Sequence, residues 1–519
     1  MTASRGQRRA SVGALAGVFM AALALVCAVA PALARADEAL LPSPDDLEQQ
    51  GLSVEPDESE IDEPVDPTDQ GHEAPIGAEP EGLTLDEELD AYFARNFSAS
   101  GLPGIAVAVV SSDEVRYEAT FGDVESVDDT FLVGSLSKSL TALSIMQLVE
   151  RGLVDLDAPA VTYAPGYDVS SVVSVRDLLN QTSGFGYYES LADAQVGDTL
   201  GSFSYANANY DLLGRIVENV SGLTYGSYLR KNVFGPLGMA DASVPGELER
   251  APEAVGHRSW FGAYVADGFI HEQGDDAWGG SASGYVRASL SDMVSYLQMY
   301  LNSGAGALSA AGIHRMVFDR VSDGGDTYYG MGWTTYTWDD GELVLSHDGQ
   351  VENYAARMCV LPGRDLAVVM LADANDEFGG NDTFFSMGDD VLTMAIGGEP
   401  QGIDAAEHVE SHVAYDVVYA LALAAAAAPL VLTMARTLKG RRPRRTGVAR
   451  GILSVGLHVL LPVYLLGLPG ALGMRFEDFA DFYPDQAVVL VAGTALLAAA
   501  GSLKLVLWLH ARRQKGTCQ

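Results

Sequence analysis

The stretch Phe131-Leu-Val-Gly-Ser-Leu-Ser-Lys138 joins a short apolar run to a helix that is apolar on nearly every side. We predict this helix over residues 136–150, and a helix with apolar residues all round is typical of a buried one. Ser135 lies at its first turn, where free backbone N–H groups and the positive end of the helix dipole are close to its side chain. Lys138 follows three residues later on the same helical face. The pattern therefore places a hydroxyl and an amine within reach of each other.

A serine and a lysine at this spacing can act as a nucleophile and its base. A serine hydroxyl is a weak nucleophile until a neighbouring base takes its proton, and a lysine is such a base only when burial lowers its pKa. The motif alone has a second interpretation, because Ser-x-x-Lys also occurs where a helix begins with an exposed lysine. Other segments of the chain are needed to distinguish a catalytic pair from an exposed lysine.

Two later segments carry polar residues that complement the pair. Phe203-Ser-Tyr205-Ala-Asn207 places a tyrosine and an asparagine on a loop just before a predicted helix over Tyr210–Ser221. Ser346-His-Asp-Gly-Gln350 ends a predicted strand with a histidine and a glycine. In order and spacing, the three pieces resemble the Ser-x-x-Lys, Tyr-x-Asn and Lys/His-x-Gly elements of the penicillin-recognising serine hydrolases. The branch they resemble contains class C β-lactamases, D-specific peptidases and related esterases, and the resemblance covers about residues 84–400.

The resemblance implies catalytic roles for three residues. Ser135 would attack a carbonyl and become acylated, while Lys138 and Tyr205 would share the general-base and general-acid work. A phenol is useful here only if cationic neighbours such as Lys138 lower its pKa. We expect no cofactor, because the histidines and nearby acids show no metal-ligand spacing and no Gly-rich loop precedes a helix as a phosphate-binding loop does.

Substrate-binding roles are implied for four further residues. Asn207 would bind a substrate amide or hold the lysine, and Gly349 would let the strand edge approach the substrate backbone. The backbone N–H groups of Gln350 and of the nucleophile would form an oxyanion hole. His347 departs from the lactamase pattern, which usually has a lysine there to attract a substrate carboxylate. Since histidine is often neutral near pH 7, and esterases and D-aminopeptidases of the family often carry it, we expect ester or amide hydrolysis.

The predicted elements around these motifs indicate an α/β (α+β) fold of the β-lactamase type. Short strands are predicted at both ends of the region, with helices and polar loops between them. We therefore expect the two ends to share one antiparallel sheet, flanked by helices and with a helical lobe inserted. The predicted segments are a helix over Thr84–Asn96 that begins with a capping box, strands over Gly104–Val110, Glu114–Gly122, Thr327–Trp338, Leu343–Ser346, Tyr354–Leu361 and Leu366–Ala372, and a helix over Ser289–Asn302.

The N-terminal residues have the pattern of an exported protein. Arginines precede an apolar run from about Val12 to Val29, and Pro31 and several alanines follow. We predict a signal peptide over residues 1–36, with an uncleaved signal anchor as the alternative because the run is almost long enough to span a bilayer. From Asp37 to Asp90 there are 20 acidic residues and no Lys or Arg, which predicts a disordered linker over residues 37–82.

The C-terminal residues, 413–519, contain three apolar stretches that we predict to cross a membrane: Val417–Ala435, Ile452–Leu472 and Ala487–Leu509. The loop between the first two carries seven Lys and Arg residues, whereas the next loop carries one base and four acids. The positive-inside rule then places the first loop and the basic tail in the cytoplasm. The hydrolase region, residues 83–403, would lie outside, in agreement with a signal peptide.

The charge of the chain excludes one class of function and supports this topology. A formal net charge of −39 is incompatible with nucleic-acid binding, and the acids are concentrated between the two basic ends. The sequence thus predicts a multi-pass membrane-anchored, exterior-facing serine hydrolase that acts on a small-molecule or peptide substrate: an ester, an amide or a D-amino-acid peptide. The alternatives are a penicillin-binding-type sensor that is acylated without efficient turnover, and a tail with a separate membrane function.

Overall fold

The computed structural model describes residues 83–246, 252–271, 273–338, 340–440 and 448–516. The predicted signal peptide and acidic linker lie outside the described residues. Helix α3 (Leu85–Ser100) comes first, and Thr84 caps it: the Glu87 N–H donates to the Thr84 hydroxyl, while the Glu87 carboxylate accepts from the Thr84 N–H at 2.9 Å. The predicted capping box is therefore present, and the helix runs four residues beyond the expected end.

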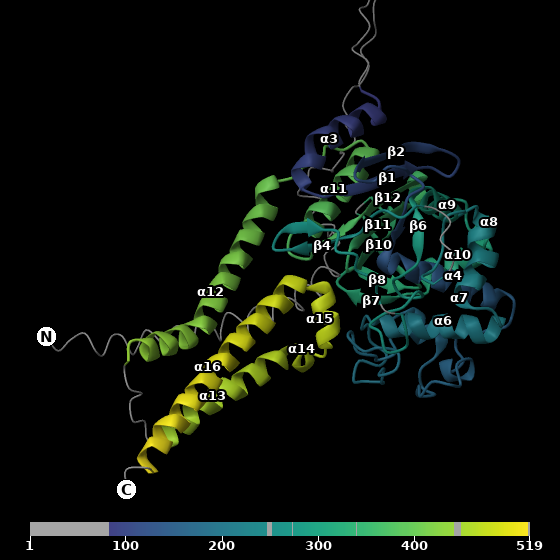
Figure 1. The fold of residues 1–519 in the computed structure, drawn as a ribbon. Coiled ribbons are helices and arrows are strands. Elements are labelled where there is room, and N and C mark those ends of the chain that lie inside the picture. Colours follow the sequence, from purple (N-terminus) through teal and green to yellow (C-terminus); the bar gives the residue numbers. More distant parts are fainter. Residues whose placement is uncertain (1–82, 247–251, 272, 339, 441–447, 517–519) are drawn as a thin grey trace, which may run out of the picture.

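One eight-stranded antiparallel sheet is built from both ends of the hydrolase region, as predicted (Figure 1). Its strand order is β2-β1-β12-β11-β10-β9-β8-β7. The N-terminal hairpin of β1 (Gly104–Val110) and β2 (Val115–Gly122) pairs through β1 with the late strand β12 (Leu366–Ala372). The remaining strands are β11 (Tyr354–Leu361), β10 (Leu343–Val351), β9 (Trp333–Thr337), β8 (Thr327–Gly330) and β7 (Val321–Gly324).

Two strands differ from the prediction. The single strand expected over Thr327–Trp338 is divided into β8 and β9 by a tight turn at Met331 and Gly332, both with positive φ. A Cβ on Gly332 would lie 2.5 Å from the backbone of Ser139, so only glycine lets this turn pack against the helix after Ser135. Strand β10 also continues past Ser346 to Val351, which carries the predicted site residues into the sheet itself.

Helices cover both faces of the sheet. On one face α3 packs with α11 (Gly380–Ala395) over an apolar cluster. On the other face lies the larger core, which contains α4 (Ser137–Glu150) and the inserted lobe. Residues 137–148 of α4 are all buried, as its all-round apolar pattern predicts. The other elements of this region are α5 (Val175–Leu179), α6 (Asn207–Ser221), α7 (Tyr225–Leu229), α8 (Gly235–Leu237), α9 (Leu290–Leu301), α10 (Ala310–Phe318), β3 (Thr130–Leu132), β4 (His257–Trp260), β5 (Ala263–Val265), β6 (Arg287–Ser289) and β13 (Ala374–Asn375).

The C-terminal residues form a separate group of long helices that extends away from the sheet (Figure 1). Within the described part of the chain, the two stretches Val409–Leu438 and Pro484–Ala511 are long and apolar enough to cross a membrane. The helices are α12 (Ala405–Leu438), α13 (Val448–Leu466), α14 (Leu468–Ala471), α15 (Phe476–Phe482) and α16 (Pro484–Gly516).

The second predicted span corresponds to two consecutive helices. We expected it to run over Ile452–Leu472, but α13 ends at Leu466, and Gly467 separates it from the short helix α14. The 19 residues of α13 fall within the range of about 17–25 that a bilayer crossing requires, so the second span stays a prediction.

Candidate active site

Ser135 lies on a turn that is pressed against strand β10. The turn is a short 3₁₀ helix, Gly134–Leu136, that runs directly into α4. Gly134 has a φ of +56°, and a Cβ there would lie 2.4 Å from the backbone nitrogen of Gln350. A Cβ on Gly349 would lie 2.3 Å from the carbonyl oxygen of Val133. Two glycines therefore permit the serine turn and the Gly349–Gln350 segment to touch, which is the arrangement expected of an oxyanion hole.

Lys138 is fully buried beside the serine. Its Nζ lies 2.8 Å from Ser135 Oγ, 2.8 Å from Asn207 Oδ1 and 2.8 Å from the carbonyl oxygen of Ser283. These three contacts hold the amine in place, because a lysine amine forms at most three hydrogen bonds and all three are made here. Asn207 begins helix α6, so the second sequence motif holds the lysine of the first, as one of its two expected roles requires.

Tyr205 contacts the same hydroxyl from the other side. Its phenol donates to Ser135 Oγ at 2.9 Å, and Lys138 Nζ lies 4.6 Å from the centre of its ring. Tyr205 and Tyr329 form an edge-to-face ring pair with centres 5.9 Å apart. The hydroxyl of Ser135 therefore has two proton-carrying groups at hydrogen-bond distance.

His347 lies on β10 and is buried as a neutral side chain. Burial is the largest cause of the low pKa of His347, which is about 3. Its Nδ1 lies 2.6 Å from the carbonyl oxygen of Asp348, and because a carbonyl only accepts, this contact requires the proton on Nδ1. The other nitrogen, Nε2, is therefore an acceptor, and it has no hydrogen-bond partner within the described residues.

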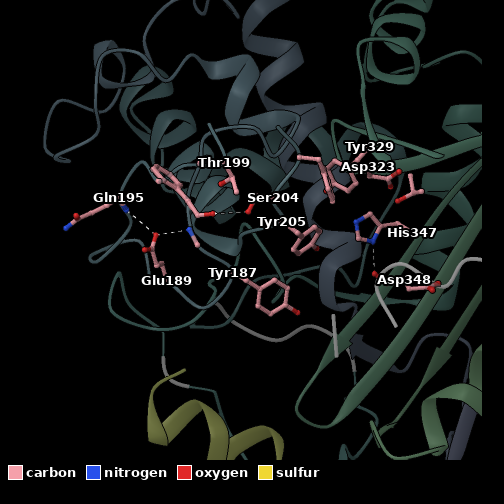
Figure 2. Close-up of a pocket in the computed structure, with 16 residues that line it drawn as sticks. Tyr187, Glu189, Gln195, Thr199, Ser204, Tyr205, Asp323, Tyr329, His347 and Asp348 are labelled. Carbon is pink, nitrogen blue, oxygen red and sulfur yellow. Dashed lines mark hydrogen bonds between the residues drawn. The ribbon is translucent and has the colours of Figure 1, made fainter. Parts of the chain in front are cut away.

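Two cavities of unequal size adjoin Tyr205, and the smaller one is lined by Ser135. The larger, about 600 Å³, contains His347 and lies within the usual size range of ligand pockets (Figure 2). Among the described residues that line it, none is a Lys or Arg. The aromatic and acidic residues of the lining are Phe185, Tyr187, Phe203, Tyr205, Tyr329, Glu189, Asp323 and Asp348. The smaller, about 60 Å³, contains Ser135 itself together with Asn207 and Gln350. Tyr187, Tyr205 and Asp348 line both cavities.

The structure thus brings the predicted site residues together. Ser135, Lys138, Tyr205 and Asn207 form one hydrogen-bonded group, and Gly349 lies against the serine turn. Gln350 lines the small cavity and His347 the large one. Among the described residues, there is no group of three or more His, Cys, Asp or Glu side chains that could hold a metal ion.

Several residues of the site were missed by sequence reasoning. The Ser283 carbonyl that holds Lys138 is a backbone atom and leaves no sequence signal. Gln181 accepts a hydrogen bond from the Ala206 N–H at 3.0 Å and so positions the loop that carries Tyr205. Its φ of +59° and its buried amide mark it as special only in the folded structure.

Comparison with known proteins agrees with this geometry. Residues 89–385 match the family model described as Beta-lactamase. The chain is 27% identical over 312 residues to penicillin-binding protein 4 of Amycolatopsis lactamdurans, which covers 52% of this chain and 81% of that protein. It is 23% identical over 325 residues to protein flp of Staphylococcus aureus, covering 56% of this chain and 64% of that protein. The octameric penicillin-binding protein homologue from Pyrococcus abyssi shares the fold, with a TM-score of 0.51, 23% identity, and coverage of 60% of this chain and 78% of that one.

Proposed function

Because the chain belongs to the Beta-lactamase family, we propose that it hydrolyses a small ester, amide or D-amino-acid peptide through an acyl intermediate on Ser135. The observation that carries the proposal is the pair of contacts to Ser135 Oγ, from Lys138 Nζ at 2.8 Å and from the Tyr205 hydroxyl at 2.9 Å. A nucleophile with two proton-carrying partners is the arrangement that acyl transfer requires.

Acylation follows from these contacts. A neutral Lys138 would take the Ser135 proton as Oγ attacks the carbonyl, while Asn207 and the Ser283 carbonyl keep Nζ in position. The developing oxyanion would be stabilised by backbone N–H groups of Ser135 and Gln350; one such donor typically contributes about 2.7–4 kcal/mol. The Tyr205 hydroxyl would protonate the leaving group. In deacylation, water attacks the ester, its proton passes to the same pair, and Oγ leaves protonated.

The electrostatics of the larger cavity favour neutral or cationic substrates over carboxylates. A pKa of about 3 leaves His347 uncharged at neutral pH, so it cannot replace the lysine that attracts a carboxylate in lactamases. Three acids line the cavity, and none of the described residues that line it is a Lys or Arg. Asp348 is paired with the buried Arg357, which leaves Glu189 and Asp323 as the described acids of the lining without such a partner. This supports ester or amide hydrolysis more than β-lactam hydrolysis.

We further propose that the C-terminal helices anchor the hydrolase to a membrane, with the catalytic domain on the exterior. Support comes from the exposed apolar side chains of α12, such as Val417 at 54% and Leu421 at 58% exposure. Only 17% of the most apolar stretch of α12 and 39% of that of α16 is buried, unlike a core helix. The basic loop after α12 and the basic tail support the orientation.

A substrate screen on the full-length protein in detergent tests the proposed activity. The substrates are p-nitrophenyl acetate, D-alanine p-nitroanilide and a chromogenic cephalosporin, with Ser135→Ala as the control. We expect steady product release from the ester or the anilide that the control lacks. A single burst followed by a stable adduct would instead support the sensor alternative, and the absence of both release and adduct would contradict either function.

A further inference from the structure

Helix α15 reaches the active site from the C-terminal helical group. It connects α14 with α16 and lies at the end of that group nearest the sheet (Figure 1). Its last residue, Phe482, lines the small cavity that holds Ser135. The ring of Phe482 contacts that of Trp278 edge to face, with centres 5.1 Å apart. A residue of the membrane-anchor region is therefore part of the cleft around the nucleophile.

The Trp278 ring that receives Phe482 is itself fixed. Its Nε1 donates to the carbonyl of Tyr187 at 2.8 Å, and its ring lies 5.5 Å from the Tyr187 ring and 5.3 Å from the Tyr188 ring. Aromatic contacts of this kind stabilise the packing beyond the area that they bury. Phe482 thus packs against a rigid aromatic surface of the catalytic domain.

Polar contacts hold both ends of α15 against the catalytic domain. At its start, Arg475 donates to the carbonyl of Asp276. Near its end, Arg258 Nη1 donates to the carbonyl of Asp481 at 3.0 Å. The next residue, Tyr483, is buried and donates its hydroxyl to Glu377, which also lines the small cavity.

The two cavities have different roles in the proposed reaction. The oxyanion-hole residue Gln350 and the nucleophile both lie in the small cavity, so the substrate carbonyl must be bound there. His347, with its acceptor Nε2, lines the large cavity. Tyr205 lies between the two cavities, where it can protonate a leaving group that departs into the large cavity. The acyl part of the substrate then stays in the small cavity, and its about 60 Å³ has room for a few water molecules or an acetyl-sized group.

We infer that α15 is a specificity element: Phe482 closes the acyl side of the site and restricts it to short acyl groups, while the large cavity takes a bulkier leaving group. This rests on the proposed acyl-enzyme function. Since one methylene in an apolar pocket is worth about 10-fold or more in selectivity, a truncated Phe482 should admit longer chains.

The test compares p-nitrophenyl acetate, butyrate and hexanoate on the full-length protein in detergent. The measured quantity is the ratio of kcat/KM for each longer ester to that for the acetate, within one variant. For native protein we expect the ratio to fall with chain length. For Phe482→Ala we expect the hexanoate ratio to rise by about 10-fold or more, and for Phe482→Leu by less.

Phe476→Ala is the matched control, because Phe476 lies on α15 and packs against Phe479 but does not line the cavity. It should keep the native chain-length profile. An unchanged profile in Phe482→Ala, with active native protein, overturns the inference alone. The same shift in Phe476→Ala also overturns it, because general loosening of α15 would then be the cause. Native protein that no ester acylates overturns this inference together with the proposed function.

Discussion

The Nζ atom of Lys138 lies 2.8 Å from Oγ of Ser135, and the Asn207 side chain and the Ser283 carbonyl hold it there. The two residues belong to one sequence motif, but the partners that hold the lysine come from the start of α6 and from the loop before β6. The base is therefore positioned by the inserted lobe, and the nucleophile by the 3₁₀ turn Gly134–Leu136 that runs into α4.

Loss of the amine should remove most of the acylation rate. We expect Lys138→Met to react with a fluorophosphonate about 10²–10⁴-fold more slowly than native protein, the usual contribution of a positioned base. Lys138→Arg should lose as much, because a guanidinium keeps the charge but cannot act as a base. Lys231→Met, at an exposed position, is the control. Near-native labelling of Lys138→Arg would show that only the positive charge is needed.

Substrates with a carboxylate on the leaving group should react poorly. The test compares 4-acetoxybenzoate with 4-acetoxybenzamide, which has a similar shape but no charge. We expect kcat/KM to be at least about 10-fold lower for the carboxylate. The reason is that a like charge at about 4 Å costs up to about 4 kcal/mol near a protein surface. The acids Glu189 and Asp323 are the source of the repulsion, because Asp348 is paired with Arg357, whose Nε lies 3.3 Å from Asp348 Oδ1. Added salt should narrow the difference. A preference for the carboxylate would contradict the assigned electrostatics.

The buried, neutral state of His347 should be visible in the acid stability of the fold. Its pKa is about 3 in the folded protein, against about 6.5 for an unperturbed histidine. Between these values the folded state binds fewer protons than the unfolded state, so stability present above about pH 6.5 is lost as the pH falls towards about 3. His347→Gln lacks this group, and its melting temperature should fall less than that of native protein between about pH 7 and about pH 4. Equal falls would show that His347 is not buried as a neutral group.

The fold was predictable where local signals suffice. The capping box at Thr84 and the buried pattern of α4 identified their helices, and the strands over Gly104–Val110 and Leu366–Ala372 have the predicted bounds. The turn at Gly332 was not predictable, because glycine is needed there only by the approach of Ser139, a contact between distant segments.

Some residues of the candidate site were likewise predictable from the sequence, and others were not. Three motifs carried its chemistry, and the folded chain places Lys138 and Tyr205 on the Ser135 hydroxyl. Phe482 had no sequence signal, since its place in the site depends on how the C-terminal helices pack against the catalytic domain. The low pKa of His347 likewise results from burial that only the tertiary structure creates.

The central claim is that Ser135 is the nucleophile, and intact-mass and peptide mass spectrometry of fluorophosphonate-treated full-length protein tests it most directly. The account predicts one adduct per chain, located on the peptide that contains Ser135, and no adduct on Ser135→Ala. An unlabelled native protein, or equal labelling of native and Ser135→Ala proteins, would contradict it.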